Sequence, residues 1–154
     1  MTPAKLYLED LHPGQTFESG SHTLTAAEIK EFAARFDPQF FHLDEEAAKD
    51  SLFGGLASSG WNVAAITMRL MVEASPIAGG LIGAGAEIAW PRPTRPGDTL
   101  RVVMEVLDVT PSRSRPDRGM ALVQSKTFNQ HGEIAQTMTS RMVVPRRPIA
   151  ETEK

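Results

Sequence analysis

The pattern of apolar and polar residues predicts two longer helices in the first half of the chain. The first begins after Thr25, whose side chain can cap the amides of the first turn, with Glu28 as its capping-box partner. Its apolar residues recur at helical spacing and are Ile29, Phe32, Ala33 and Phe36. The second helix runs from Ser58 or Ser59 to Glu73 and is apolar on most faces. We therefore expect it to be buried on most sides.

A loop and a shorter helix are expected between these two helices. Asp37 precedes Pro38, and proline disfavours helical geometry at the residue before it, so the first helix should end there. Asp37 and His42 are then expected to lie on an irregular loop rather than inside a helix. Asp44 is expected to cap a short helix that continues to residue 49 and is broken by a pair of glycines.

The remaining pattern is typical of β-strands. A short extended segment and a Pro13-Gly14 turn precede a strand around Phe17. Four more segments of strand character follow the long helix, at about 84–92, 98–109, 119–130 and 133–144. A short turn links the last two, which should pair antiparallel. One long buried helix followed by antiparallel strands predicts an α+β fold, with a sheet curled around a central helix.

The length of 154 residues fits one domain with its own core. We expect this domain to span residues 1–146 and to be followed by a flexible polar tail at 147–154. The sequence has no run of eighteen apolar residues, and its N-terminus lacks the features of a signal peptide. The expectation is a cytoplasmic protein that does not bind membranes.

Charge and residue types narrow the candidate chemistry. A net charge of -3 argues against a dedicated nucleic-acid-binding protein. The chain has no cysteine, which excludes disulfides, thiolate metal sites and cysteine nucleophiles. Its four histidines show no paired ligand spacing, so we expect no metal site. Candidate chemistry therefore rests on histidine, carboxylates, serine or the backbone.

Asp37 and His42 are the main candidates for that chemistry. A carboxylate and an imidazole on one loop can handle a proton together, whereas each alone has a simpler interpretation. Asp-Pro pairs commonly open turns, and a histidine beside two phenylalanines is often a packing residue. Gly60 lies at the expected start of the long helix, where free N–H groups and the helix dipole stabilise an oxyanion. A glycine there can also simply allow tight packing.

These residues resemble the signature of the MaoC-like dehydratases and (R)-specific enoyl-CoA hydratases, and the resemblance covers nearly the whole chain. The matching residues are Asp37, His42, Asp44, Phe53-Gly54-Gly55, Gly60 and Arg95-Pro96-Gly97-Asp98. The resemblance implies a hotdog fold, in which an antiparallel sheet wraps around a long central helix and two subunits join their sheets in a homodimer or larger homo-oligomer. It also implies a hydro-lyase of fatty acid metabolism that adds water to a trans-2-enoyl-CoA. No metal or redox cofactor is implied, and coenzyme A is part of the substrate.

The resemblance implies catalytic roles for three residues. Asp37 and His42 would hold one water, with one group acting as base and the other delivering a proton. The amide of Gly60 would polarise the thioester carbonyl. The chain departs from the signature at Gln39 and Phe40, where the family has Asn and Pro, and at Ser59, where it has His. An acyl-thioester binding module without hydratase activity and an acyl-CoA thioesterase therefore remain alternatives.

Substrate binding is expected at two places. Gln39, Ser59 and Trp61 lie beside the candidate pair in the sequence, and Trp61 and Trp90 either line an acyl tunnel or pack in the core. The second place is a predicted hairpin loop whose arginines are Arg113, Arg115 and Arg118. Their planar guanidinium groups could hold the phosphates of coenzyme A, or the loop could be a solvated turn. Arg92 and Arg95 allow the same two interpretations.

Overall fold

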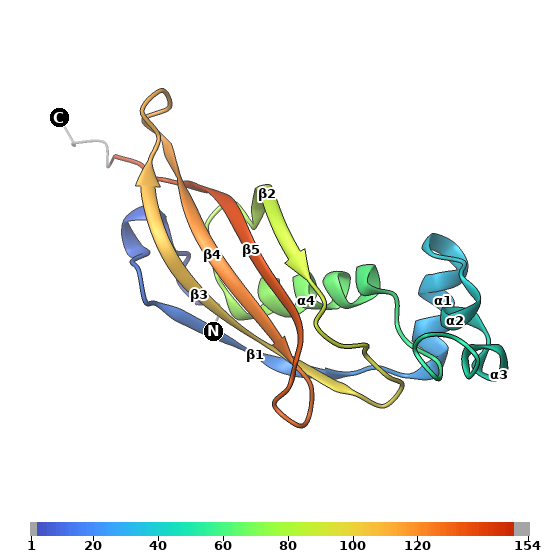
Figure 1. Ribbon diagram of the computed structural model, residues 1–154. Coiled ribbons are helices and arrows are strands. Elements are labelled where there is room, and N and C mark those ends of the chain that lie inside the picture. The colour runs from blue at the N-terminus through green and yellow to red at the C-terminus, as the bar shows by residue number, and fades with distance from the viewer. Residues whose placement is uncertain (1–2, 150–154) are drawn as a thin grey trace.

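The chain forms one five-stranded sheet, with a long helix against one face and shorter helices beyond one end (Figure 1). The computed structural model describes residues 3–149. The helices are η1 (Leu8–Asp10, a 3-10 helix), α1 (Ala26–Phe36), α2 (Phe40–Leu43), α3 (Glu45–Ala48) and α4 (Gly60–Ala74). The strands are β1 (Thr16–Thr23), β2 (Ile82–Ala89), β3 (Thr99–Pro111), β4 (Arg118–Phe128) and β5 (Ile134–Pro145).

Polar side chains cap three of the helices. The Thr25 side chain accepts a hydrogen bond from the Glu28 amide at the start of α1, as its capping position predicts. The carboxylate of Asp44 accepts two amide hydrogen bonds at the start of α3. At the start of α4 the Ser59 hydroxyl accepts a hydrogen bond from the Trp61 amide at 3.2 Å. The expected starts of these three helices are therefore confirmed.

The expected irregular loop from residue 37 to residue 43 is partly wrong. Asp37 does lie outside the helices, as the residue that ends α1, but His42 lies inside the single helical turn α2. Proline restricts only the residue before it, so Pro38 does not prevent a new turn from starting two residues later. The Asp44 amide closes that turn by donating to the carbonyl of Phe40 at 2.9 Å.

The strand order in the sheet is β1-β3-β4-β5-β2, and every neighbouring pair is antiparallel. Strands β4 and β5 pair as the short turn between them predicts. Strand β2, which follows the long helix, crosses to the edge beside β5 rather than pairing with β3. The expected α+β architecture, an antiparallel sheet with a central helix, is confirmed.

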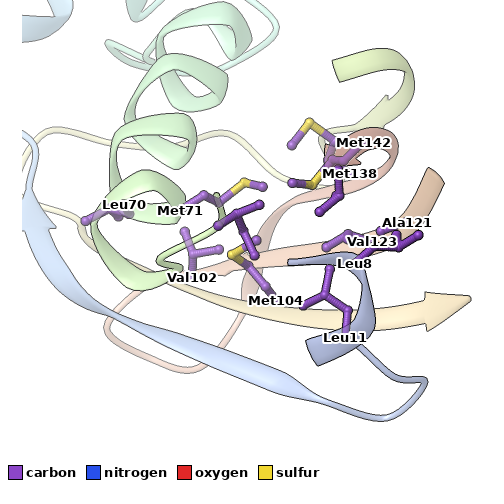
Figure 2. Close-up of a cluster of buried hydrophobic side chains, with 12 residues drawn as sticks. Leu8, Leu11, Leu70, Met71, Val102, Met104, Ala121, Val123, Met138 and Met142 are labelled. Atoms are coloured by element: carbon purple, nitrogen blue, oxygen red, sulfur yellow. The ribbon is translucent and has the colours of Figure 1, made fainter. Parts of the chain in front are cut away.

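Helix α4 packs one face against the sheet. Its residues Leu70 and Met71 belong to the main core cluster, and Met71 points toward residues from β3, β4 and β5 (Figure 2). The opposite face is exposed, and its apolar residues follow a helical stripe: Trp61, Ala65, Met68 and Val72. The expectation that this helix is buried on most sides is therefore wrong for the single chain, because one sheet face can cover only one side of a helix.

The C-terminal segment is tied to the start of the chain. Arg147 pairs with Asp10 and lies over the ring of Tyr7, 4.8 Å from its centroid. Of the tail expected at 147–154, residues 150–154 lie outside the described part of the chain. Among residues 3–149, no helix is long and apolar enough to cross a membrane.

Candidate active site

The structure brings Asp37 and His42 into direct contact. Asp37 ends α1, and the turn of α2 points the His42 imidazole back toward it. His42 Nε2 lies 3.2 Å from Asp37 Oδ2. The imidazole is only 4% exposed, so the contact is shielded from bulk water on most sides. The short turn that the sequence did not predict is thus what aligns the pair.

The other nitrogen of His42 is fixed by the backbone. His42 Nδ1 lies 2.6 Å from the carbonyl oxygen of Ala57, and the Ala57 amide in turn donates to the carbonyl of Phe41. A carbonyl only accepts, so Nδ1 must carry a proton. Nε2 faces a carboxylate, which also only accepts. Both ring nitrogens are therefore best satisfied as donors, and a proton can be held between imidazole and carboxylate.

The surroundings of Asp37 favour its charged form. Gln39 Nε2 donates to Asp37 Oδ1 at 2.5 Å. Partial burial alone would raise the pKa of Asp37. Together, the hydrogen bonds from Gln39, Ser59 and His42 and the nearby charge of His42 outweigh burial, so the pKa lies below its ordinary value of 3.8. Asp37 is thus a carboxylate at neutral pH.

The N-terminus of α4 forms another wall of the site. Among residues 3–149, nothing accepts a hydrogen bond from the Gly60 amide, which lies in the first turn of the helix. A side chain at this position would collide with Trp90, because an added Cβ would approach the indole to 2.6 Å. The glycine therefore allows both a free N–H donor and the close approach of the indole.

A cleft of about 430 Å³ joins these groups. Its polar side holds Asp37, His42 and Gly60, and the predicted binding residues Gln39, Ser59 and Trp61 also line it. The remaining walls are mostly apolar and consist of Phe41, Phe53, Val63, Trp90, Pro91, Pro93, Ser58, Arg92 and Thr94. Trp61 and Trp90 meet edge to face with ring centroids 5.3 Å apart, and both are partly exposed rather than core residues.

The sequence did not indicate Phe41, Phe53, Pro91, Pro93 or Thr94 as residues of the cleft, and Arg92 was a candidate only for phosphate binding. Phe53 opens the Phe-Gly-Gly segment, and residues 91–94 directly precede the Arg-Pro-Gly-Asp segment. The Phe-Gly-Gly and Arg-Pro-Gly-Asp segments were both recognisable as motifs in the sequence. Their place in the cleft depends on the fold, because the Ser58 amide donates to the carbonyl of Thr94 and so joins two segments distant in sequence.

The three hairpin arginines lie in another part of the molecule, away from the cleft. Arg113 and Arg115 belong to the turn between β3 and β4, and Arg118 is the first residue of β4, at the end of the sheet opposite α1 and α2 (Figure 1). Twelve steps along β3 span roughly 40 Å at the usual rise per residue. Arg118 is paired with Asp117 at 2.9 Å, while Arg113 and Arg115 are exposed. Within one subunit they do not reach the Asp37 and His42 pair, and their phosphate-binding role stays a prediction.

A larger groove of about 490 Å³ lies on another side of α4. Its rim carries charged residues of both signs, including Glu28, Arg35 and Arg69. His22 is paired there with Glu28 at 2.7 Å, but both side chains are substantially exposed. The smaller cleft combines a buried acid–base pair with a free amide and apolar walls, so it is the better candidate for an active site. Among residues 3–149, no group of three or more His, Asp or Glu side chains is placed to hold a metal ion.

Comparison with known proteins gives consistent matches. The model of the MaoC like domain family matches residues 10–127. The solved structure of a MaoC-like dehydratase from Rhodospirillum rubrum has a TM-score of 0.91 and 60% sequence identity, covering 94% of this chain and 99% of that one. An (R)-hydratase from A. caviae involved in PHA biosynthesis has a TM-score of 0.70 and 27% identity, covering 90% and 99%. The uncharacterized protein YdeM of Bacillus subtilis (strain 168) is 35% identical over 126 residues, covering 80% of this chain and 87% of YdeM.

Proposed function

The chain belongs to the MaoC-like domain family, and we propose that it is a hydro-lyase that adds water to a 2-enoyl thioester or removes it from a 3-hydroxyacyl thioester. The proposed thiol is coenzyme A. The observation that carries the proposal is the pair of His42 and Asp37, 3.2 Å apart, in the lining of a mostly apolar cleft. The likeness to an (R)-hydratase supports the same reaction class.

In the proposed hydration step, the Asp37 carboxylate accepts a proton from water while the water oxygen bonds to the β-carbon of the enoyl group. The electron pair of the double bond moves toward the thioester carbonyl, and His42 donates its Nε2 proton to the α-carbon. The pair then holds one proton on Asp37 and a neutral imidazole with Nδ1–H. Return of that proton across the 3.2 Å contact resets the site.

The Gly60 amide is the proposed oxyanion donor. Negative charge develops on the carbonyl oxygen as the double bond is attacked, and a fixed N–H at a helix N-terminus stabilises it. The Trp90 indole packs directly beside this glycine, so it forms a wall of the site next to the donor. The acyl group would lie along the aromatic and proline walls of the cleft, where an apolar chain is favoured over water.

A homodimer is part of the proposal. The exposed apolar stripe of α4 faces outward, and the edge strand β2 is exposed along most of its length. A groove of about 270 Å³, lined by apolar residues such as Met68 and Leu81, runs between them. An exposed apolar surface next to an unpaired strand edge is a surface that proteins normally cover. A second copy of the chain is the occupant that the family resemblance implies.

One observation favours a rival function. Gln39 holds one oxygen of the Asp37 carboxylate at 2.5 Å, and it stands where the family has Asn. If that contact persists with substrate bound, water has less access to the carboxylate. The chain would then be a thioester-binding module without hydratase activity.

Incubation with crotonyl-CoA and longer trans-2-enoyl-CoAs tests the proposal directly. Loss of the conjugated thioester absorbance, with release of no free thiol, is the expected result. Tight binding of the same thioesters without turnover would favour the binding module. Release of free thiol would identify a thioesterase. Either outcome would overturn the hydro-lyase assignment.

A further inference from the structure

Arg95 directs its guanidinium group at the backbone of a neighbouring loop rather than at solvent. Arg95 Nη1 donates to the carbonyls of Gly55 at 3.1 Å and Leu56 at 3.3 Å. Arg95 Nη2 donates to the carbonyl of Phe53. The side chain is half-buried, and all three acceptors are backbone carbonyls within four residues. The guanidinium therefore acts as a clamp on residues 53–56, a role different from phosphate binding.

The clamped segment leads directly to the carbonyl that fixes His42. Ala57 follows Leu56, and its carbonyl accepts the hydrogen bond from His42 Nδ1 at 2.6 Å. The next residue is also held, because the Ser58 amide donates to the carbonyl of Thr94 at 2.8 Å. Two adjacent residues, Thr94 and Arg95, thus hold the loop on both sides of Ala57. The position of the Ala57 carbonyl follows from these contacts.

The clamp has its own rigid base. The Arg95 amide donates to Asp98 Oδ2 at 2.8 Å, and the Asp98 amide donates to the carbonyl of Arg95 at 3.1 Å. Gly97 completes this turn with a φ of +88°, a conformation that other residues rarely adopt. The Arg-Pro-Gly-Asp segment therefore presents the guanidinium from a fixed backbone position. A lysine could supply one charged point there but not a planar fork that reaches several carbonyls.

We infer that Arg95 is a positioning residue for His42: it places the Ala57 carbonyl, which in turn keeps the proton on Nδ1 and directs Nε2 at Asp37. This inference rests on the proposed function for its effect on catalysis. Its effect on the imidazole itself does not depend on any substrate. Arg95 touches neither reacting atoms nor, among the described residues, the Asp37 carboxylate.

The test uses the full chain with Arg95→Met and Arg95→Lys, and with Arg69→Met as the matched control. Arg69 is an exposed arginine on α4 that pairs with Glu73 and lies outside the cleft. Nitrogen NMR of the imidazoles, with the His42 signals identified by their loss in His42→Asn, reports which ring nitrogen carries a proton. At a fixed, slightly alkaline pH, the fraction of His42 protonated at Nδ1 should fall at least about twofold in Arg95→Met, since its acceptor is displaced. Arg95→Lys should lie between, and the control should match the unmodified chain.

Kinetics gives the second readout. Displacement of a catalytic group by about 1 Å can lower turnover roughly 100-fold, so kcat for crotonyl-CoA should fall by that order in Arg95→Met with a smaller change in KM. Unchanged Nδ1 protonation in folded Arg95→Met would overturn the inference, even if turnover fell. If Arg95→Met does not fold, the same criterion applies to Arg95→Lys. If the unmodified chain hydrates no thioester, the proposed function fails while the NMR result still decides the role of Arg95.

Discussion

Asp37 accepts hydrogen bonds from the side chains of Gln39, Ser59 and His42, so its role can be tested at the scale of the single residue. Replacing it with asparagine keeps the shape and the contact with Gln39 but removes the charge that accepts a proton. Positioned acid–base groups contribute roughly 10² to 10⁴ in rate, so Asp37→Asn should lower kcat for crotonyl-CoA by that order without unfolding the chain. The loss of enoyl absorbance measures kcat, and circular dichroism measures whether the variant remains folded. Asp50→Asn, an exposed carboxylate in the turn after α3, should retain full activity.

The lowered pKa of Asp37 predicts a pH window for stability. A carboxyl whose pKa is depressed by folding stabilises the folded state above its unfolded value of 3.8, and the effect is lost as pH falls through the lower folded pKa. Urea unfolding of the unmodified chain and of Asp37→Asn measures this contribution with His42, one source of the lowered pKa, in place. The difference in unfolding free energy should be retained down to about pH 5 and shrink as the pH falls through and below 3.8. A difference that already shrinks between pH 5 and 7 would indicate a raised pKa instead.

Gly60 has no room for a side chain. A Cβ there would lie 2.6 to 2.9 Å from three atoms of the Trp90 indole, so Gly60→Ala forces the indole away. Overpacking of this kind lowers stability by about 1–3 kcal/mol, and hydration should fall as well because the oxyanion donor is disturbed. Thermal unfolding and the enoyl assay measure the effects. Gly20→Ala, where nothing lies within 4 Å of the added carbon, should be nearly neutral. If Trp90→Val does not restore stability to Gly60→Ala, the collision is not the cause.

Individual residues were predictable from the sequence where their chemistry is local. The spacing of Asp37 and His42, and the glycine at a helix start, mark a candidate site without any structure. The acceptor of His42 Nδ1 lies fifteen residues away at Ala57, and it is a backbone carbonyl. Every residue has such a carbonyl, so residue type carried no signal for it. The clamp by Arg95 was hidden for the same reason.

At the scale of the element, the start of α4 serves stability and the site together. The Ser59 hydroxyl caps this helix through the Trp61 amide, and it also helps to lower the pKa of Asp37. Ser59→Ala should therefore reduce the free energy of unfolding by about 0.5–2 kcal/mol and also slow hydration. Thr25→Ala removes the corresponding cap of α1, and Thr25 is not among the residues that line the cleft. It should cost similar stability, measured by urea unfolding, and leave kcat unchanged. Equal kcat values for both variants would contradict the role of Ser59 in the site.

Helices and strands with strong local signals were predicted well, and the misses share one physical cause. The caps at Thr25, Asp44 and Ser59 fixed the helix starts because capping depends on neighbouring residues. The turn of α2 has no such cap, since its first residue follows Gln39 without a side-chain hydrogen bond. It is held instead by tertiary contacts, including the Ala57 amide on the carbonyl of Phe41. Strand order was likewise invisible, because β2 pairs with the last strand of the chain.

At the scale of the whole molecule, one face of α4 and the edge strand β2 form an apolar surface that no other described element covers. Val72 is 55% exposed on α4, and Ile82 is 53% exposed at the start of the edge strand β2. The sequence predicted a helix apolar on most faces, but only the fold reveals which face the sheet covers. The stripe on α4 and the edge of β2 border one groove, so a single partner surface could cover both. This arrangement supports association through that side of the molecule.

A charge placed on that surface should separate the subunits. Val72→Glu would have to bury a carboxylate in the proposed interface, and Ile82→Lys would place a charge on the strand edge that pairing would cover. Both variants should be monomeric by light scattering at micromolar concentration, where the unmodified chain is expected to have at least twice the subunit mass. Their melting temperatures should also lose the concentration dependence that a dimer shows. Leu52→Glu is the matched control, since Leu52 is a fully exposed apolar residue outside the groove. An unmodified chain that is already monomeric would refute the dimer, whereas a dimer retained in both charge variants would place its interface on another surface.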